Sequence, residues 1–168
     1  KLPNPPPRFV GRTREIRWLR AAVARAPVTV IAGEGGLGKS ALALFVLHAR
    51  FASKIDGVLY LSFRDLDPHE PVALGLVRAL VRAGGVRHFD WAELLAAPEA
   101  LGAVAVGLAE TQRRWILLDD LHHGDPAQVE ALLVHAARYA RHGRFVVTTR
   151  RAPADAALLG QVLHLGAM

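Results

Sequence analysis

Hydrophobic residues along this chain form two kinds of pattern, short apolar runs and longer amphipathic stretches. The short runs are 28–33, 57–63, 115–120, 144–150 and 161–165, and their length and branched side chains predict strands. The longer stretches predict helices over 13–26, 40–51, 71–83, 90–111 and 125–141, with breaks near Gly84–Gly85 and Pro98. Apolar strands that alternate with helices are typical of a parallel sheet covered on both faces, so we expect an α/β fold.

Signals at the ends of these elements refine the prediction. Thr13 is expected to cap the first helix and Pro27 to end it, and Asp125 with Pro126 is expected to open the helix over 125–141. The segment 1–10 contains "KLPNPPPRF" (1–9) and predicts an extended, proline-rich linker. Residues 11–168 are expected to form one domain.

The composition excludes several classes of protein. A chain of 168 residues has the size of one domain. It has no uninterrupted apolar run of about 18 residues, so a membrane span is not expected. Cysteine is absent, which excludes disulfides and thiolate metal sites. With no secretion signal in view, we expect a cytoplasmic protein. Because residue 1 is lysine rather than methionine, we take the chain for a piece of a longer protein.

The net charge of +6 lies entirely near the N-terminus. Residues 1–27 contain seven basic side chains and one acidic side chain, whereas residues 28–168 contain fourteen of each and are neutral. On the helix predicted over 13–26, most arginines lie opposite the stripe of Ile16, Leu19, Val23 and Ala26. A solvated outer face explains this pattern, and an acidic partner or nucleic acid is the alternative.

The stretch "GEGGLGKS" (33–40) has the spacing of a Walker A motif, Gly33-x4-Gly38-Lys39-Ser40. It follows a predicted strand and precedes a predicted helix, which is the context that this motif requires. Its glycines allow backbone N–H groups to surround phosphate oxygens, and the N-terminus of the following helix attracts the anion. Lys39 is expected to reach the outer phosphates and the Ser40 hydroxyl to ligate Mg²⁺.

A second strand, "WILLDD" (115–120), ends in two carboxylates. Asp119 is expected to hold Mg²⁺ through water, as a Walker B acid does, and Asp120 to orient or deprotonate the attacking water. The alternative is that the two carboxylates only cap the next turn.

Two further patterns suggest other chemistry more weakly. "SKID" (53–56) resembles a guanine-binding motif, but it precedes the second strand instead of following a late one, so guanine specificity is not expected. His122 and His123 are adjacent, so their side chains are expected to diverge, and they lack the spacing of a metal-binding pair. We interpret them as polar residues of a loop or of the phosphate surroundings.

The order of these motifs resembles the STAND ATPases, signal-transduction NTPases that include the NB-ARC proteins. The resemblance covers residues 3–151 through "PPPRFVGRTREIRWL", the P-loop, "GVLYLSF", "LLDDLHHGDP" and "RFVVTTR". It implies a three-layer P-loop NTPase fold, with a five-stranded, mainly parallel sheet and helices on both faces. It also implies that "RFVVTTR" is a sensor strand between the strands of the P-loop and of Walker B.

The resemblance further implies roles for individual residues, with ATP or ADP and Mg²⁺ as ligands. Phe9, Val10, Gly11 and Arg12 would frame adenine. The phosphates and metal would be held by Gly33, Gly35, Gly36, Leu37, Gly38, Lys39, Ser40, Ala41 and Leu42. Ser40 and Asp119 would bind Mg²⁺, and Lys39, Asp120 and Arg150 would be the catalytic residues, with Arg150 approaching the terminal phosphate.

Two interpretations follow from this resemblance. The chain is expected to be the ATP/ADP-binding core of a signalling or transcription-regulatory switch with slow ATP hydrolysis. The alternative is an AAA+ ATPase of DNA replication or remodelling, and a phosphotransferase is a weaker third. The family's helical, winged-helix and sensor domains would be partners outside residues 1–168. Self-association on activation stays open, and direct nucleic-acid binding by these residues is not expected.

Overall fold

A computed structural model of the chain describes residues 1–54, 57–155 and 161–168. Ile55 and Asp56 of the "SKID" segment lie outside the described residues. The strands are β1 (Val28–Ala32), β2 (Val58–Ser62), β3 (Trp115–Asp119), β4 (Arg144–Thr149) and β5 (Gln161–His164). The α-helices are α1 (Thr13–Arg25), α2 (Lys39–Arg50), α3 (Val72–Ala83), α4 (Trp91–Ala96), α5 (Leu101–Thr111) and α6 (Pro126–Tyr139). Short 3-10 turns are η2 (Phe63–Asp65), η3 (Pro98–Ala100) and η4 (Leu121–His123).

The five strands form one sheet in the order β2-β3-β4-β1-β5, and every neighbouring pair is parallel. The expected α/β fold is confirmed, and the sheet is wholly rather than mainly parallel. β4 lies between β1 and β3, as the sensor strand was expected to. Because all strands run in one direction, their carboxyl ends meet at one edge of the sheet.

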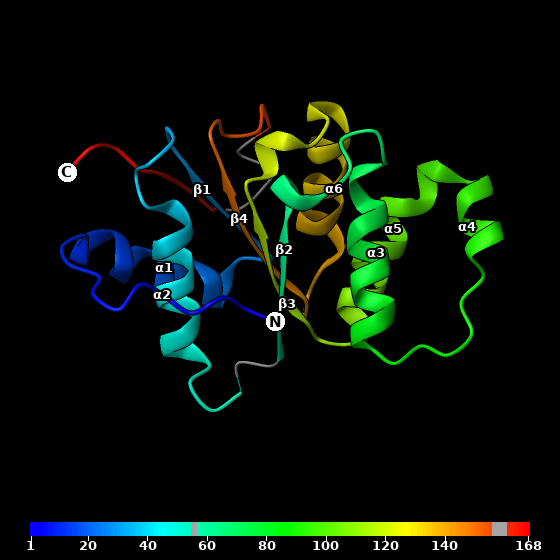
Figure 1. The fold of residues 1–168 in the computed structure, drawn as a ribbon, viewed down its shortest axis with the longest axis horizontal. Coiled ribbons are helices and arrows are strands. Elements are labelled where there is room, and N and C mark those ends of the chain that lie inside the picture. Colours follow the sequence, from blue (N-terminus) through cyan, green and yellow to red (C-terminus); the bar gives the residue numbers. More distant parts are fainter. Residues whose placement is uncertain (55–56, 156–160) are drawn as a thin grey trace.

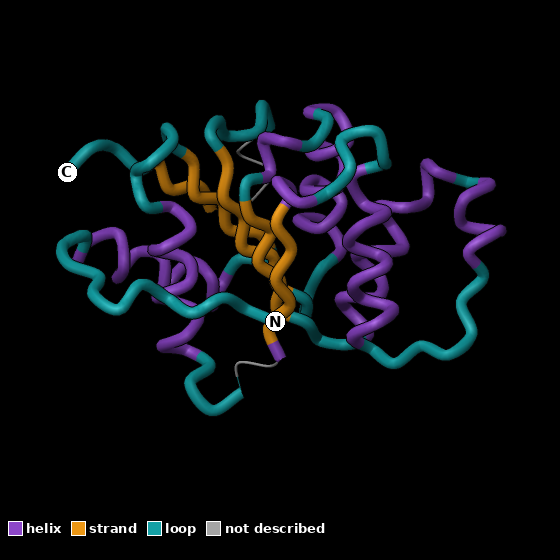
Figure 2. The backbone as a smooth tube through the Cα atoms, in the orientation of Figure 1, coloured by secondary structure: helices purple, strands orange, loops and turns teal. Residues whose placement is uncertain are grey.

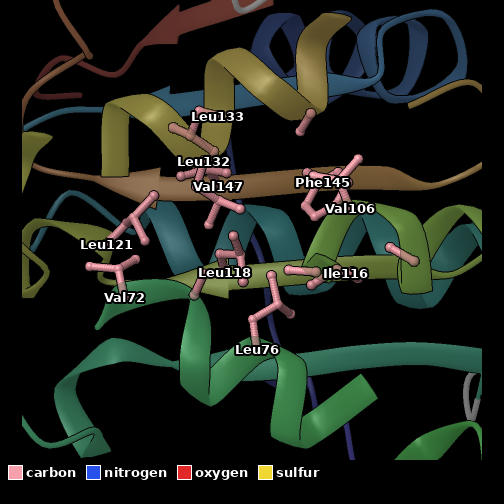
Figure 3. Close-up of a cluster of buried hydrophobic side chains, with 14 of the residues drawn as sticks. Val72, Leu76, Val106, Ile116, Leu118, Leu121, Leu132, Leu133, Phe145 and Val147 are labelled. Carbon is pink, nitrogen blue, oxygen red and sulfur yellow. The ribbon is translucent and has the colours of Figure 1, made fainter. Parts of the chain in front are cut away.

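Helices cover both faces of this sheet and give three layers (Figures 1 and 2). Alternate residues of each strand face opposite helices. Ile31, Leu117 and Val146 pack with α1 and α2 on one face. Val30, Ile116, Leu118 and Val147 belong to the cluster of α3, α5 and α6 on the other face, part of which Figure 3 shows. The sheet is therefore buried on both sides, which explains its solid apolar runs.

The first helix begins differently from the prediction. Its N-cap is Arg12, in the left-handed region at φ 54°, and Thr13 is its first helical residue, so the expected cap at Thr13 is wrong. The Arg12 side chain donates to distant backbone carbonyls instead of capping the helix. Asp125 does cap α6, since its carboxylate accepts from the N–H of Gln128, and Pro126 is the first helical residue.

The segment 1–10, predicted as a linker, lies along α1 and α2, the helices that cover one face of the sheet. Leu2 is buried among the residues of α1 and α2, and the carbonyl of Pro3 lies 2.7 Å from His48 Nε2. Phe9 stacks on Phe45 of α2, with ring centroids 5.2 Å apart. The segment therefore contacts the domain at Leu2, Pro3 and Phe9.

Candidate functional site

The loop between β1 and α2 has the backbone conformation of a phosphate cradle. Gly36 and Gly38 adopt positive φ angles of 79° and 83°, which side chains with a Cβ rarely take. Gly38 is also the N-cap of α2, so the loop ends at the N-terminus of a helix. Gly33 lies so close to the chain after β5 that a Cβ would stand 2.5 Å from the carbonyl oxygen of Leu165.

Lys39 lies beneath this loop and is 6% exposed. Its Nζ donates a 2.8 Å hydrogen bond to the carbonyl oxygen of Glu34, so the side chain spans the loop. Burial lowers the pKa of Lys39, the carboxylates of Asp120 and Asp119 oppose this shift, and the nearby Arg150 adds to it. The ammonium group is thus held where phosphate oxygens would approach.

The carboxylate of Asp119, at the end of β3, accepts hydrogen bonds from three hydroxyl groups. Ser40 Oγ donates to Oδ1 over 2.7 Å, Thr148 Oγ1 donates to the same oxygen, and Tyr60 donates to Oδ2 over 3.0 Å. Asp119 is 5% exposed, so these donors replace the water that a carboxylate needs. Burial and the adjacent Asp119 raise the pKa of Tyr60 to about 12.

Asp120 stands at the turn after β3 with a positive φ of 56°. Its N–H donates to Thr148 Oγ1 over 3.0 Å, and its carboxylate forms a 2.9 Å ion pair with Arg64. Arg64 belongs to η2, directly after β2, and its side chain is 66% exposed. Thr148 is therefore bonded both to the side chain of Asp119 and to the backbone of Asp120.

The end of β4 brings Thr149 and Arg150 to the same edge. The carbonyl of Thr149 accepts from the N–H of Gly33 over 3.2 Å, which joins β4 to the start of the loop. The guanidinium of Arg150 extends over the loop, where a Cβ at Gly35 would stand 3.9 Å from it. Arg150 is exposed and has no hydrogen-bond or ion-pair partner within residues 1–54, 57–155 and 161–168.

The residues predicted to frame adenine lie on the opposite side of the loop. Arg12 donates to the carbonyls of Leu37 and Gly166 over 3.1 and 2.9 Å and pairs with Glu15. Val10 is 80% exposed, and Phe9 stacks on α2 as described above. Arg12 therefore connects the P-loop with the segment after β5, and adenine contact by residues 9–12 stays a prediction.

A hollow of about 680 Å³ opens beside Arg150, between α6 and the segment after β4. His122 lines it, and both ring nitrogens of His122 are buried without a hydrogen-bond partner among the described residues. The prediction that His122 and His123 diverge is wrong, because the η4 turn packs their rings 4.3 Å apart. Burial and the neighbouring His123 lower the pKa of His122.

The donor set at this edge fits Mg²⁺ and a nucleoside phosphate. A hydroxyl and a carboxylate from separate elements lie 2.7 Å apart at Ser40 and Asp119, and Mg²⁺ prefers such oxygen ligands together with phosphates and water. The glycine-rich loop and the buried Lys39 provide backbone donors and a cation on the same side.

Three of the residues around the acids were not predicted from the sequence. Tyr60, Arg64 and Thr148 reach Asp119 or Asp120 only because β2, β3 and β4 are neighbours in the sheet. Arg64 and Thr148 lie at or near the carboxyl end of a predicted strand, whereas Tyr60 is at the centre of one and has no such signal.

Comparison with known proteins supports this fold. No model of a known protein family matches the chain. Regulatory protein AfsR of Streptomyces griseus is 30% identical over 138 residues, which are 79% of this chain and 14% of AfsR. A STAND protein with a tetratricopeptide repeat sensor from Pyrococcus horikoshii superposes with a TM-score of 0.63 at 18% identity, over 98% of this chain and 24% of that protein.

Cdc6p of Pyrobaculum aerophilum superposes with a TM-score of 0.66 at 13% identity, over 95% of this chain and 46% of Cdc6p. At these identities the solved structures show the fold alone. The predicted three-layer P-loop fold is thereby confirmed. The chain spans less than half the length of each of these proteins.

Proposed function

We propose that this chain, which resembles the STAND-class P-loop ATPases in fold and motif order, is the ATP/ADP-binding core of a regulatory switch. In this proposal it binds ATP with Mg²⁺, hydrolyses it slowly and remains bound to ADP. The longer protein would use the nucleotide state to control signalling or transcription.

The observation on which this proposal rests is the contact between Ser40 and Asp119. These residues are 79 positions apart in sequence, and the fold brings Ser40 Oγ within 2.7 Å of the Asp119 carboxylate. Ser40 and Asp119 would hold Mg²⁺ at this place, and the ion would supply positive charge against the charge that develops on the phosphates. The buried Lys39 supports the same assignment, because an ammonium group beneath a glycine-rich loop is suited to phosphate oxygens.

We assign roles in hydrolysis to two further side chains, Asp120 and Arg150. Asp120 would orient or deprotonate the attacking water, since it is the carboxylate next to the metal-binding acid. Arg150 would contact the γ-phosphate, because its guanidinium extends over the loop and is not engaged by another described residue. Slow turnover is expected since Glu34, Gly35 and Gly36 are exposed and leave this side of the loop open to water.

Calorimetric titration with ADP and with Mg-ATP tests the proposal. Lys39→Ala is expected to weaken binding by about 10- to 150-fold, because it removes a charge-assisted contact worth about 1.5–3 kcal/mol. Lys54→Ala is the matched control, since Lys54 is exposed and follows the end of α2 that is far from the loop, and it should leave affinity unchanged. Equal affinity of Lys39→Ala and the unsubstituted chain would contradict a nucleotide site at this loop.

Competition against a fluorescent ADP tests base preference. ATP and ADP are expected to displace the probe much better than GTP, because "SKID" is misplaced for guanine recognition. Equal displacement by GTP would contradict the assignment of residues 9–12 to adenine.

An AAA+ ATPase of DNA replication is the second candidate, because the fold shared with Cdc6p is compatible with either function. The two candidates differ in their response to DNA. A replication ATPase is expected to bind duplex DNA or to change its ATPase rate with DNA, whereas the switch core is not. An ATPase assay with and without duplex DNA therefore separates them.

A further inference from the structure

The carboxylate of Asp119 receives its three hydroxyl donors unevenly. Oδ1 accepts from Ser40 and Thr148, whereas Tyr60 is the donor to Oδ2 among the described residues. In the proposed function the Ser40 hydroxyl also ligates Mg²⁺, so the Oδ1 side is the one that faces the metal. Tyr60 contacts the opposite oxygen, away from Ser40.

The position of Tyr60 is fixed by the sheet. It lies in β2, whose register with β3 pairs Tyr60 with Leu117 and Ser62 with Asp119. Its ring packs against the core between the sheet and the helices α1 and α2. Its hydroxyl donates to Oδ2 over 3.0 Å, so the phenol acts as a hydrogen-bond donor to the carboxylate.

We propose that Tyr60 is a positioning residue for Mg²⁺: by bonding Oδ2 it fixes the rotation of the Asp119 carboxylate, so that Oδ1 is presented to the metal and its water. This inference rests on the proposed function. Outer partners that orient a metal-binding carboxylate change metal affinity by about 10- to 100-fold when removed. Because Asp119 is expected to act through water, a smaller effect of about 3- to 10-fold is expected here.

Tyr60→Phe is the critical variant, because it removes the hydroxyl and keeps the ring in the core. ADP affinity is measured by calorimetry in EDTA and then over a series of Mg²⁺ concentrations. We expect the Mg²⁺ concentration for half-maximal enhancement of ADP binding to rise about 3- to 10-fold, with affinity in EDTA unchanged. Tyr139→Phe is the matched control, since Tyr139 is 60% exposed on α6 and should change neither value.

Thr148 provides a second, independent pair of variants. Thr148→Val removes the other fixed donor to Asp119 at nearly constant shape, and Thr148→Ser retains it. We expect the Mg²⁺ requirement to rise in the valine variant and to stay close to normal in the serine variant. Thermal unfolding of each variant shows whether it is folded at the temperature of the titration.

Each outcome bears on a different statement. If folded Tyr60→Phe has an unchanged Mg²⁺ requirement, this inference is overturned but the proposed function is not. The same holds if Tyr60→Phe loses ADP affinity equally in EDTA and in Mg²⁺, because that result would indicate a purely structural role. If the unsubstituted chain binds no ADP under either condition, the proposed function is overturned and this inference with it.

Discussion

Gly33 begins the glycine-rich loop and lies directly against the chain after β5. Since a Cβ there would stand 2.5 Å from a backbone carbonyl, Gly33→Ala forces the backbone to move. We expect it to lower the free energy of unfolding by about 1–3 kcal/mol in urea denaturation. Gly107 is the control: it lies in α5 with no described atom within 4 Å of an added Cβ, so Gly107→Ala should stabilise by about 0.5–1 kcal/mol. Similar stabilities for the two variants would contradict this.

Arg150 should distinguish ATP from ADP. If its guanidinium contacts the γ-phosphate, Arg150→Ala weakens Mg-ATP binding by about 10-fold and leaves ADP binding nearly unchanged, because ADP lacks that phosphate. Arg151→Ala, at the next exposed position, is expected to change neither affinity. Equal losses for both nucleotides in Arg150→Ala would indicate contact with the shared phosphates.

Among individual residues, the sequence predicts those whose chemistry follows from a local motif. Lys39 and Ser40 are identified by the spacing of their glycines, and Asp119 by the apolar strand before it. Tyr60 and Thr148 could not be identified in this way, because their contact with Asp119 depends on which strands are neighbours. No local pattern states the order of strands in a sheet.

Among the elements, the turn from α6 to β4 depends on a carboxylate from a third element. Glu110, at the end of α5, accepts backbone N–H bonds of 2.8–3.0 Å from Arg141, His142 and Gly143. Burial raises the pKa of Glu110, but these bonds and the His142 side chain outweigh it and lower the pKa to about 2. Glu110→Gln is expected to destabilise the fold by about 1–2 kcal/mol at neutral pH.

The pH dependence of this contribution follows from the direction of the shift. A carboxylate whose pKa is 4.5 when unfolded and about 2 when folded stabilises the fold fully above pH 4.5. The stabilisation is lost as pH falls from 4.5 towards 2. Urea denaturation of Glu110→Gln should therefore show a flatter pH dependence in this window than the unsubstituted chain. Glu99→Gln, at an exposed site in η3, should leave the dependence unchanged.

The elements themselves were predicted closely, because each differs from its neighbours in period and most have a glycine or proline close to one end. The stretch 90–111 is divided at Pro98 into α4, η3 and α5, and a break near Pro98 was expected. The start of α1 was not predicted, since the conformation of Arg12 depends on carbonyl groups at Leu37 and Gly166. A helix end that is fixed by long-range contacts has no signature in its own segment.

For the molecule as a whole, ATP turnover is expected to be slow. In P-loop enzymes an arginine supplied by a partner accelerates hydrolysis by about 10³–10⁵, so a core without such a partner should turn over on the order of once per minute or more slowly. Asp120→Asn should slow it further and leave binding near normal, because the amide keeps the shape of the carboxylate. A single-turnover assay with labelled ATP measures both, and rapid multiple turnover would favour the AAA+ alternative.

None of the helices within the described residues is long and apolar enough to cross a membrane.

The positive charge of residues 1–27 lies largely on the outer side of α1, where Arg14, Arg17 and Arg20 are exposed. This agrees with the solvated face predicted from the helical pattern. Binding of an acidic partner there stays an alternative.

The order of strands has a consequence for the sequence of events in folding. β1 precedes the phosphate-binding loop, and its two neighbours are β4 and β5, which follow it by more than a hundred residues. Pairing between such distant segments is slow, because the intervening chain must first be ordered. During synthesis β1 emerges before both of its partners and cannot pair in the native sheet until residue 144 and beyond are available. The glycine-rich loop is thus made well before β4 and β5 but acquires its structure only after they have been made.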